Sequence, residues 1–586
     1  MRYFLLTLSF LIAFFAVMPA FADEEVFPVK VNGVVVMRLF DTMEDNEQDL
    51  SSNAEAVLKA KAGEGADPSE LRAEKTEEGV AIYWGSSLVI VVTPSQAKMQ
   101  SSDNEALAGV WIRNIRKALE VKPLKLSSNK LLIPFGDSDY VTAGESGAFS
   151  FSYDKKCLDV SAEGDAVIFT PLRTGEFTVV IKRGRAKGSV KIISKERAGV
   201  IAPSISLEVT GDPASSEIIK SAILYRINDA VELKPGASLY LKDELVVHQG
   251  LSSGDRMTVP VAVVAEGKGY ISSEGTISVS VVNSGIQWNG EGVLWVSNRP
   301  EIVSRDGVLF RRELSRPGMA RLMYSHKNGS SFHRRLSISF RNNSLKNARM
   351  LFRNASAGPD KYEMYAGHKA AVRYMSLMCT GSGYVLDVPP RTTVIMSDTN
   401  ITPGYLFSGL CELMLLDGDS VEVRVESFPA SGKKGRLEDI NEPFDPFKIH
   451  PHGVFPSSFI SMERSFSVSG GDLEVEVGKW PWLIDAETGE PNTGNFGVVY
   501  SIDAELVNDT AYPVSVDLLF TPMNGTSQGT IVLDGEIMET PVVKKDEVCR
   551  IGKIRLGANE RRRVNLMTMP EASSCYPVKF SFSKGL

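Results

Sequence analysis

Short runs of alternating apolar and polar residues dominate this chain. Residues 257–265 and 275–283 alternate or are rich in β-branched residues, and 165–181 repeats the pattern on both sides of a Gly-centred turn. Alternation with a period of two places apolar side chains on one face of a strand. Between 285 and 430 such runs recur roughly every ten residues with little helical periodicity, which is typical of a β-sandwich. The pattern predicts a mainly β fold.

Three segments have helical patterns instead. Residues 53–62 are rich in alanine, and in 105–119 the apolar residues Leu107, Val110 or Trp111, Ile115 and Leu119 recur at helical spacing. Together with the β-branched run at 80–92, these two segments predict a small α/β module near the N-terminus. Residues 215–227 predict a third helix, because serines suited to N-capping precede its apolar positions.

The first 22 residues have the pattern of a secretory signal peptide. Arg2 precedes an apolar stretch that ends near Met18, and Ala20 and Ala22 are the small residues that signal peptidase requires. The apolar stretch is too short for a stable membrane span, although a retained N-terminal anchor stays open as the alternative. No later stretch of about 18 apolar residues follows. We therefore expect a periplasmic or extracellular protein with no membrane span after signal cleavage.

Two parts of the chain resemble known kinds of exported protein. The Gly-turn-strand pattern within 165–181 resembles bacterial immunoglobulin-like domains, and this resemblance covers residues 126–197. The C-terminal half resembles exported bacterial proteins of unknown function at 297–303, 494–500, 508–510 and 567–570. The second resemblance implies secretion and β-sandwich architecture. It assigns no functional residue.

Length and composition indicate several domains. The chain has 586 residues, of which 43% are hydrophobic, so it is too long for a single core and too apolar to be disordered. The fold class we expect is mainly β and multi-domain, with β-sandwich or immunoglobulin-like domains and a small N-terminal α/β module. The expected order is a signal peptide (1–22), the α/β module (23–122), an immunoglobulin-like β domain (126–197), an α+β segment (204–284), a β-sandwich (285–430), a proline-rich linker (431–458) and a C-terminal β-sandwich (459–586).

Charge excludes nucleic acid as a partner. The net charge is −8 and is spread along the chain. The basic runs at 182–185 and 561–563 are too short to follow a phosphate backbone. The partners that we still consider are polysaccharide and envelope proteins.

The five cysteines suggest two disulfides. An oxidising compartment permits disulfide bonds, and Cys379 with Cys411 and Cys549 with Cys575 are pairs that are close in sequence. Cys157 is left over, and we expect it to be a small buried apolar residue.

No motif of catalysis is present. The sequence lacks the Gly-x-Ser-x-Gly, His-Glu-x-x-His and phosphate-loop patterns, so no catalytic residue or cofactor is predicted. His450 and His452 are the best candidate pair of metal ligands, but no third ligand stands at a fixed spacing, so no metal site is predicted. The acid pairs Asp417/Asp419 and Glu422/Glu426 fit turn and strand-edge positions better than glycosidase chemistry.

A polar loop beside two tryptophans is the candidate binding site. Aromatic faces stack on sugar rings, while amides and carboxylates bind hydroxyl groups. Filling of a β-sandwich core by the tryptophans is the alternative. The residues proposed for ligand binding are Trp480, Trp482, Asp485, Asn492 and Asn495.

These observations favour an exported envelope protein with a structural, adhesive or polymer-binding role, for which cell-wall or extracellular polysaccharide is the candidate ligand. An enzyme acting on envelope polymers and an assembly factor for a surface or secretion machine remain the alternatives, because catalytic residues can also come together from distant loops.

Overall fold

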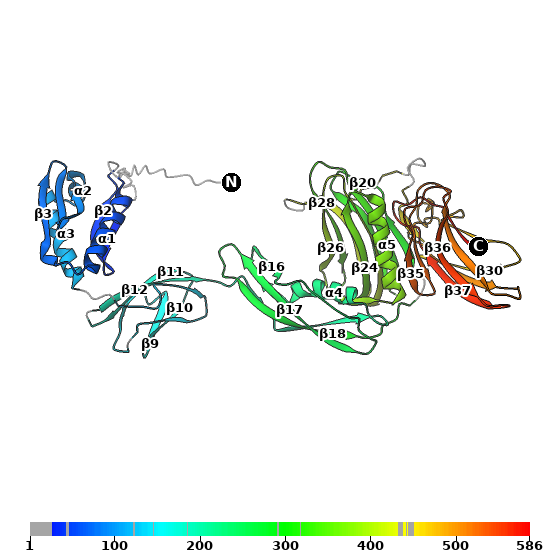
Figure 1. Cartoon of the computed structure of the whole chain (residues 1–586), viewed down its shortest axis with the longest axis horizontal. Helices are drawn as coiled ribbons and strands as arrows, with labels where there is room; N and C mark the ends of the chain where they lie inside the picture. The colour runs from blue at the N-terminus through cyan, green and yellow to red at the C-terminus, as the bar shows by residue number, and fades with distance from the viewer. Residues whose placement is uncertain are drawn as a thin grey trace, which may run out of the picture. The chain divides into compact units, whose positions relative to one another are not determined.

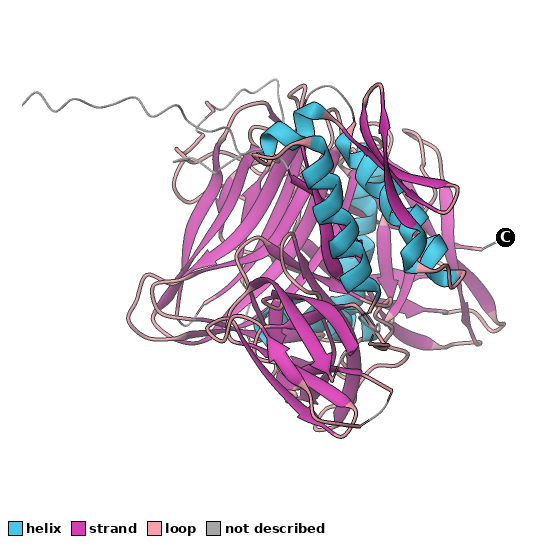
Figure 2. Ribbon diagram, turned by 90° about the vertical axis from the view of Figure 1, so that its left-hand side faces the viewer, coloured by secondary structure: helices cyan, strands magenta, loops and turns pink. Residues whose placement is uncertain are grey.

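The computed structural model describes residues 26–42, 46–120, 124–144, 146–184, 186–289, 292–316, 318–431, 437–440, 442–443 and 450–585. The expected signal peptide lies outside these residues. The chain forms two compact units, one of residues 1–198 with 266–272 and one of 199–265 with 273–586. Strands greatly outnumber helices in both units (Figures 1 and 2), so the predicted mainly β, multi-domain fold class is confirmed. No helix in the described ranges is long and apolar enough to cross a membrane.

The first unit begins with the predicted α/β module. Its helix α3 buries Trp111, while Val110 on the same helix is 39% exposed, so Trp111 is the residue that faces the core. Helix α1 contains the alanine-rich segment and packs against the β1–β2 hairpin. The elements are β1 (Val26–Val31), β2 (Val34–Phe40), α1 (Glu47–Gly63), η1 (Pro68–Glu70), β3 (Leu71–Thr76), β4 (Gly79–Trp84), β5 (Ser87–Val92), α2 (Pro94–Met99) and α3 (Asn104–Leu119).

A two-sheet β domain completes the first unit. One sheet has the order β7-β10-β9 and the other β6-β12-β11-β8, and alternate apolar residues of both sheets form a common core. The predicted turn between 171 and 175 joins the two sheets. The strands are β6 (Lys130–Pro134), β7 (Asp139–Thr142), β8 (Ser150–Ser152), β9 (Leu158–Glu163), β10 (Ala166–Pro171), β11 (Gly175–Arg183) and β12 (Ala186–Lys195).

The second unit is built on one large sheet. Its order is β16-β17-β18-β14-β25-β24-β27-β22-β19-β29, with β20 paired to β22. Segments 204–284 and 285–430 therefore share one sheet, and β29 of the expected linker joins it. The strands are β14 (Ser204–Thr210), β16 (Ala237–Leu241), β17 (Arg256–Gly267), β18 (Ser273–Asn283), β19 (Val293–Ser297), β20 (Ile302–Val303), β22 (Met319–Asn328), β24 (Ala348–Asp360), β25 (Gly383–Val388), β27 (Leu406–Asp417) and β29 (Gly453–Phe455).

A second, four-stranded sheet packs on one face of the large sheet. Phe340 of the small sheet and Phe352 of the large sheet make an edge-to-face contact at 5.3 Å across this core. The strand order is β21-β28-β23-β26. The strands are β21 (Gly307–Ser315), β23 (Arg334–Arg341), β26 (Thr393–Ile401) and β28 (Ser420–Pro429). Smaller elements of this unit are β13 (Gly199–Ile201), α4 (Ser216–Arg226), η2 (Ile227–Ala230) and β15 (Val231–Leu233).

A helix that we did not predict covers the opposite face of the large sheet. Helix α5 (Glu363–Cys379) packs on β24 and β27 (Figure 1). Its buried positions include Ala366, Ala370 and Tyr374, which stand four residues apart, so a helical pattern is present. Most residues of this pattern are small, so it is a weaker signal in the sequence than the alternation of the neighbouring strands. Gly367 is one of these small residues. A larger residue does not fit at this position, because a Cβ atom there would overlap the carbonyl oxygen of Ala572.

The C-terminal domain is a β-sandwich. The apolar runs at 499–508 and 512–520 flank a short Asn-Asp-Thr turn, a pattern that predicts paired strands. This prediction is wrong, because β32 and β33 lie in different sheets. The turn instead carries the chain from one sheet to the other. One sheet holds β30 (Phe459–Ser467), β32 (Val499–Val507), β37 (Arg561–Thr568), β34 (Thr530–Leu533) and β35 (Glu536–Glu539), and the other holds β31 (Leu473–Val477), β38 (Val578–Lys584), β33 (Val514–Pro522) and β36 (Cys549–Leu556).

Three Asn-x-Ser/Thr sequences build the same turn at strand ends of the second unit. In each, the buried asparagine amide donates to the carbonyl oxygen four residues on and to a neighbouring segment, while its oxygen accepts from the Ser or Thr two residues on. Asn328, Asn342 and Asn508 occupy this position, at 1%, 0% and 0% exposure. The Asn-x-Ser/Thr sequences at these positions are therefore structural turns.

Neither expected disulfide is formed, since all five cysteines are free thiols. Glu412 contacts helix α5, so the next side chain along β27, Cys411, points to the opposite face and cannot reach Cys379 at the end of that helix. Cys549 lies beside Phe520 in the β33–β36 pair, whereas Cys575 lies in a loop against Thr526. Cys157 is buried, as expected.

Candidate functional site

A groove opens at one side of the C-terminal sandwich, between its two sheets. Strands β30 and β31 are the edge strands of these sheets, and the loop after β31 carries Trp480 to the groove. The cavity volume is about 550 Å³. We call it the Trp480 groove, and its lining residues are Ile460, Met462, Arg464, Glu474, Val475, Glu476, Lys479, Trp480, Pro481 and Tyr500.

The groove combines an exposed aromatic ring with an apolar floor. The side chain of Trp480 is 72% exposed, whereas Tyr500 is 2% exposed and packs into the sandwich core beside Ile460 and Met462. Tyr500 is held in place because its hydroxyl oxygen accepts a hydrogen bond of 2.8 Å from the amide of Asn495. Burial raises the pKa of the Tyr500 phenol, so the floor of the groove is uncharged.

Four charged side chains surround this floor, and three of them already have ionic partners. Glu474 pairs with Lys579 at 2.7 Å, and Glu476 pairs with Lys479. Arg464 instead donates to the carbonyl oxygen of its neighbour Glu463, and among the residues that the structure describes it has no ion pair. Among the charged residues that line the groove, Arg464 is therefore the one without an ion pair in the described part of the chain.

A second hollow adjoins the groove at Arg464. It lies over β30, β32 and β37 and has a volume of about 760 Å³. Its charged side chains are mostly acidic: Glu463, Asp503, Glu505 and Asp534 line it with Arg464 and Arg563. Asp503 accepts a hydrogen bond of 2.8 Å from the amide of Asn565. Arg464 is the residue that lines both hollows.

Of the five residues predicted for ligand binding, only Trp480 lines the groove. Trp482 is half-buried and donates its indole N–H to the carbonyl oxygen of Gly478 at 3.1 Å. Asp485, Asn492 and Asn495 are buried and bond to backbone groups of their own loop. Asp485 also accepts from the backbone N–H of Val454. These three residues fix the shape of the loop and do not line the groove.

The sequence reasoning missed the strand residues Met462, Arg464 and Tyr500. Ile460, Met462 and Arg464 alternate along β30, so they share one face of the strand. That alternation was a usable signal. Their approach to Trp480, however, depends on how the two edge strands close the sandwich.

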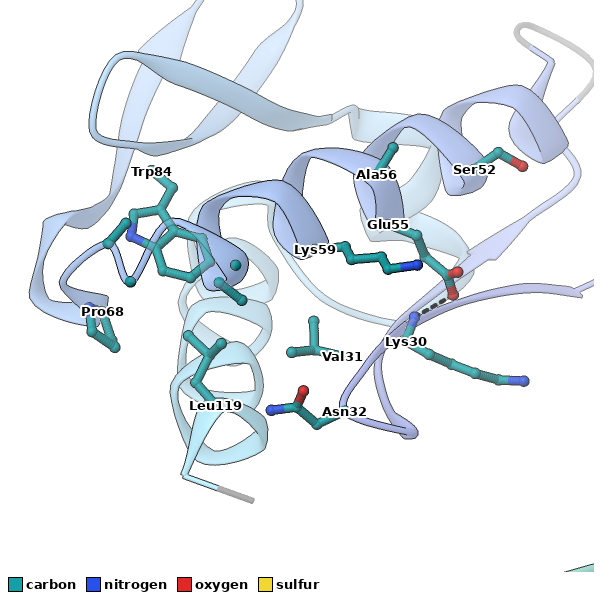
Figure 3. Close-up of a pocket in the computed structure, with 14 residues that line it drawn as sticks. Lys30, Val31, Asn32, Ser52, Glu55, Ala56, Lys59, Pro68, Trp84 and Leu119 are labelled. Carbon is teal, nitrogen blue, oxygen red and sulfur yellow. Dashed lines mark hydrogen bonds between the residues drawn. The ribbon is translucent and has the colours of Figure 1, made fainter. Parts of the chain in front are cut away.

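The first unit holds a larger cavity, of about 910 Å³, between α1, the β1–β2 hairpin and the end of α3 (Figure 3). Glu55 accepts a hydrogen bond of 2.6 Å from the backbone N–H of Lys30, whose side chain extends away from it. The one aromatic ring, that of Trp84, is fully buried and donates its N–H to the carbonyl oxygen of Asp67. This cavity therefore offers no exposed ring face.

A buried ionic cluster lies between the large sheet and α5. Glu412 accepts hydrogen bonds from Arg353 at 2.7 Å, from Tyr374 at 2.8 Å and from Arg321 at 3.2 Å. All four residues are at most 3% exposed, and we call them the Glu412 cluster. Burial alone would raise the pKa of Glu412, but the two guanidinium groups outweigh it and lower that pKa. Because its side chains are almost fully buried, the cluster belongs to the packing between the large sheet and α5 and offers no surface to a ligand.

A buried histidine connects α5 to the C-terminal sandwich. His368 contacts Glu571 at 2.8 Å through Nδ1 and Glu539 at 2.9 Å through Nε2. Burial by itself would lower the pKa of His368, but the hydrogen bonds and charges of the two carboxylates outweigh it, and the pKa is raised. His368 therefore joins the helix to the sandwich through contacts with two carboxyl groups.

No catalytic or metal site that solvent can reach forms at His326, His450 or His452. The Nε2 atom of His326 accepts from Ser297 at 2.9 Å, as in a nucleophile-base pair, but both side chains are at most 1% exposed, so a substrate has no access. His450 pairs with Glu301, whereas His452 packs edge-to-face on Phe310, so the two rings do not converge. Within the described ranges no three His, Cys, Asp or Glu side chains are placed to hold a metal ion.

Comparisons with known proteins give no family. No protein-family model and no curated protein matches the chain. Among solved structures, the M60 catalytic domain with two CBM51 domains from Clostridium perfringens ZmpB is 11% identical over 83% of this chain and 59% of its own, at a TM-score of 0.15. Domains 5–6 of the S-layer protein SbsC are 13% identical over 28% of this chain and 98% of theirs, at 0.12. The tandem Ig repeats of Dlar are 13% identical over 27% and 96%, also at 0.12. The chain thus spans less than two thirds of the first of these, and the function below is argued from its own residues.

Proposed function

We propose that this protein is exported and binds polysaccharide of the cell envelope or its surroundings through the Trp480 groove. The observation that carries the proposal is the indole of Trp480, which is 72% exposed at the mouth of a groove. Large aromatic rings are normally buried, because leaving their apolar surface in water costs free energy. An exposed ring beside polar side chains fits a ligand with an apolar face and hydroxyl groups, which describes a sugar ring.

Arg464 indicates which polysaccharides fit best. A guanidinium group without an ionic partner binds carboxylates with two parallel hydrogen bonds. In the Trp480 groove itself, Glu474 and Glu476 are paired with lysines, which leaves Arg464 as the charged lining residue available to a ligand. We therefore expect a preference for polymers that carry carboxylate groups, such as uronic acid chains or the peptide-bearing glycan of the cell wall.

Affinity electrophoresis tests this function directly. The mature chain, residues 23–586, is run through gels that contain polygalacturonate or neutral dextran. Polygalacturonate should slow the protein saturably, and Trp480→Ala should weaken binding about tenfold, because stacking of an aromatic ring contributes roughly 0.5–1.5 kcal/mol beyond its buried area. Arg464→Gln should remove the preference for the acidic polymer and the weakening by salt.

Tyr512→Ala is the matched control, because Tyr512 lies in the same sandwich, is 56% exposed and is not part of the groove. Equal retardation of wild type and Trp480→Ala would contradict the proposal. Release of soluble fragments from the polymer would favour the enzyme alternative. Export has its own test, since an intact N-terminus on protein recovered from the cytosol would contradict it.

A further inference from the structure

The β domain of the first unit has a basic surface on the four-stranded sheet β6-β12-β11-β8. Alternate apolar residues of this sheet enter the domain core, so the residues between them point to the opposite, outer face. Five lysines on three adjacent strands belong to this outer face. We call it the lysine face, and its lysines are Lys130 of β6, Lys182 of β11, and Lys187, Lys191 and Lys195 of β12.

The strand register places like charges opposite each other on this face. Lys130 is the partner of Lys191 in the β6–β12 pair, and Lys182 is the partner of Lys187 in the β11–β12 pair. Like charges that stand directly opposite on neighbouring strands destabilise a sheet. The stability of the domain therefore does not account for these two pairs, and a role in binding does.

One carboxylate offsets part of this charge. Glu176 pairs with Lys191 at 2.7 Å, and it is the one acidic residue that the described strands place on this face. Its pKa is lowered, first by the hydrogen bond with Lys191 and further by the charges of Lys130 and Lys195.

The other four lysines have no ion pair in the described part of the chain. Five lysines and one glutamate leave four positive charges on this face, although the chain as a whole has a net charge of −8. The lysine face is therefore a local concentration of positive charge that the protein itself does not neutralise.

The charges are exposed and spread over an area. Lys130, Lys182 and Lys195 are exposed, and the side chain of Lys191 is 50% exposed. The lysines extend about 26 Å along β12, at 3.3 Å per residue, and lie on three strands about 4.8 Å apart. A polymer chain that follows one line would meet only part of them, whereas an extended anionic surface can meet them all.

Apolar side chains lie among the lysines. Leu132 of β6 is 53% exposed and is the strand partner of Ile193 of β12. This apolar pair stands one step along the same face from the pair of Lys130 and Lys191. Lysines beside exposed apolar side chains suit the boundary between the headgroups and the acyl chains of a bilayer.

We propose that the lysine face binds the surface of a lipid bilayer that carries anionic headgroups. Each lysine near such a surface strengthens binding through its charge, and its flexible side chain reaches headgroups at varied positions. Leu132 contacts the boundary below the headgroups. Lysine lacks the planar fork with which an arginine such as Arg464 binds a carboxylate, so the density of negative charge selects the partner. The site is separate from the Trp480 groove.

Vesicle flotation of the mature chain, residues 23–586, tests this proposal. The vesicles contain either phosphatidylcholine alone or equal parts of phosphatidylcholine and phosphatidylglycerol. The protein should float saturably with the anionic vesicles only. Binding should be lost in salt of about 1 M, because the Debye length then falls to about 3 Å. Lys130→Gln combined with Lys195→Gln should weaken binding about 25-fold, since each lysine near an anionic surface contributes roughly a factor of five.

Lys98→Gln combined with Lys117→Gln is the matched control. Both lysines are exposed, lie on helices of the same unit outside this face, and remove the same charge. The control should float like wild type. The lysine-face variant should unfold at the same or a higher temperature than wild type, because it relieves the repulsion between Lys130 and Lys191. Its loss of binding is then not a loss of folding.

Equal flotation with both kinds of vesicle, or equal flotation of the lysine-face variant and its control, would overturn the proposal. Retardation by polygalacturonate that the lysine-face variant loses would also overturn it, because an acidic polymer would then occupy the face. Trp480→Ala should float like wild type. Vesicle binding is therefore tested independently of binding at the Trp480 groove.

Discussion

The Glu412 cluster and the Trp480 groove are built from the same kinds of side chain with opposite results. Both combine arginine, glutamate and an aromatic ring. In the cluster every charged group is at most 3% exposed and bonded to another member, and the guanidinium group of Arg353 also lies 4.3 Å from the Trp288 ring centroid. In the groove the indole is 72% exposed and Arg464 has no ion pair among the described residues.

This difference shows how structural and binding roles can be distinguished. A buried charge is tolerated only when its partners satisfy it, so such a cluster is complete without a ligand. An exposed ring and an unpaired charge at the surface form their main interactions only when a ligand binds. The loop residues Asp485, Asn492 and Asn495 resemble the cluster in this respect, because each is buried and bonded within the protein.

The largest effect is expected from Glu412→Gln. The amide leaves two buried guanidinium groups without a counter-charge, so the free energy of unfolding should fall by about 3–5 kcal/mol. Arg464→Gln, its counterpart in the groove, should change stability by less than about 0.5 kcal/mol. Differential scanning calorimetry of the mature chain measures both. Similar losses of stability for the two variants would contradict the distinction between the cluster and the groove.

His368→Gln should cost about 1–3 kcal/mol, because Glu571 would lose its charged partner in a buried site. The raised pKa of His368 sets the pH dependence. The stabilisation is complete below the unfolded pKa of about 6.5 and is lost as pH rises through the higher folded value. The stability difference between wild type and variant should therefore shrink from pH 6 to pH 9 in urea unfolding. A difference that grows with pH would show that the imidazole is neutral.

Asn342→Ala tests one of the repeated turns. The substitution removes the amide that bonds to Lys346 and Val388, so a loss of about 1–3 kcal/mol is expected. Asn400→Ala is the control, since Asn400 also begins an Asn-x-Thr sequence but is exposed on β26. Thermal unfolding should separate the two variants. Equal stability would mean that the buried turn contributes nothing.

Much of the fold was predictable because its signals are local. The strands at 257–265 and 275–283 and the helix at 105–119 follow from the spacing of apolar residues, and each is present. Helix α5 was missed because small residues such as Ala366 and Ala370 carry its pattern. The shared sheet of 204–284 and 285–430 was missed because strand pairing depends on distant partners, as in the parallel β14–β18 pair.

The residues of the candidate site also fall into those with a local sequence signal and those without one. Trp480 was found because an aromatic pair beside a polar loop is visible in sequence. Arg464 and Met462 were not found, because their strand comes close to Trp480 only when the sandwich closes. The cysteine pairs were misjudged for a related reason. Closeness in sequence does not fix the face of a sheet, and Cys411 and Cys379 lie on opposite sides of β27.

The most direct test of the account is co-sedimentation of the mature chain with purified sacculi, comparing wild type with Trp480→Ala and checking that both unfold at the same temperature. We predict saturable pelleting of wild type, loss of pelleting in the variant and equal unfolding temperatures. Equal pelleting of both proteins, or a variant that has lost stability along with binding, would contradict the claim that Trp480 is exposed in order to bind a polymer.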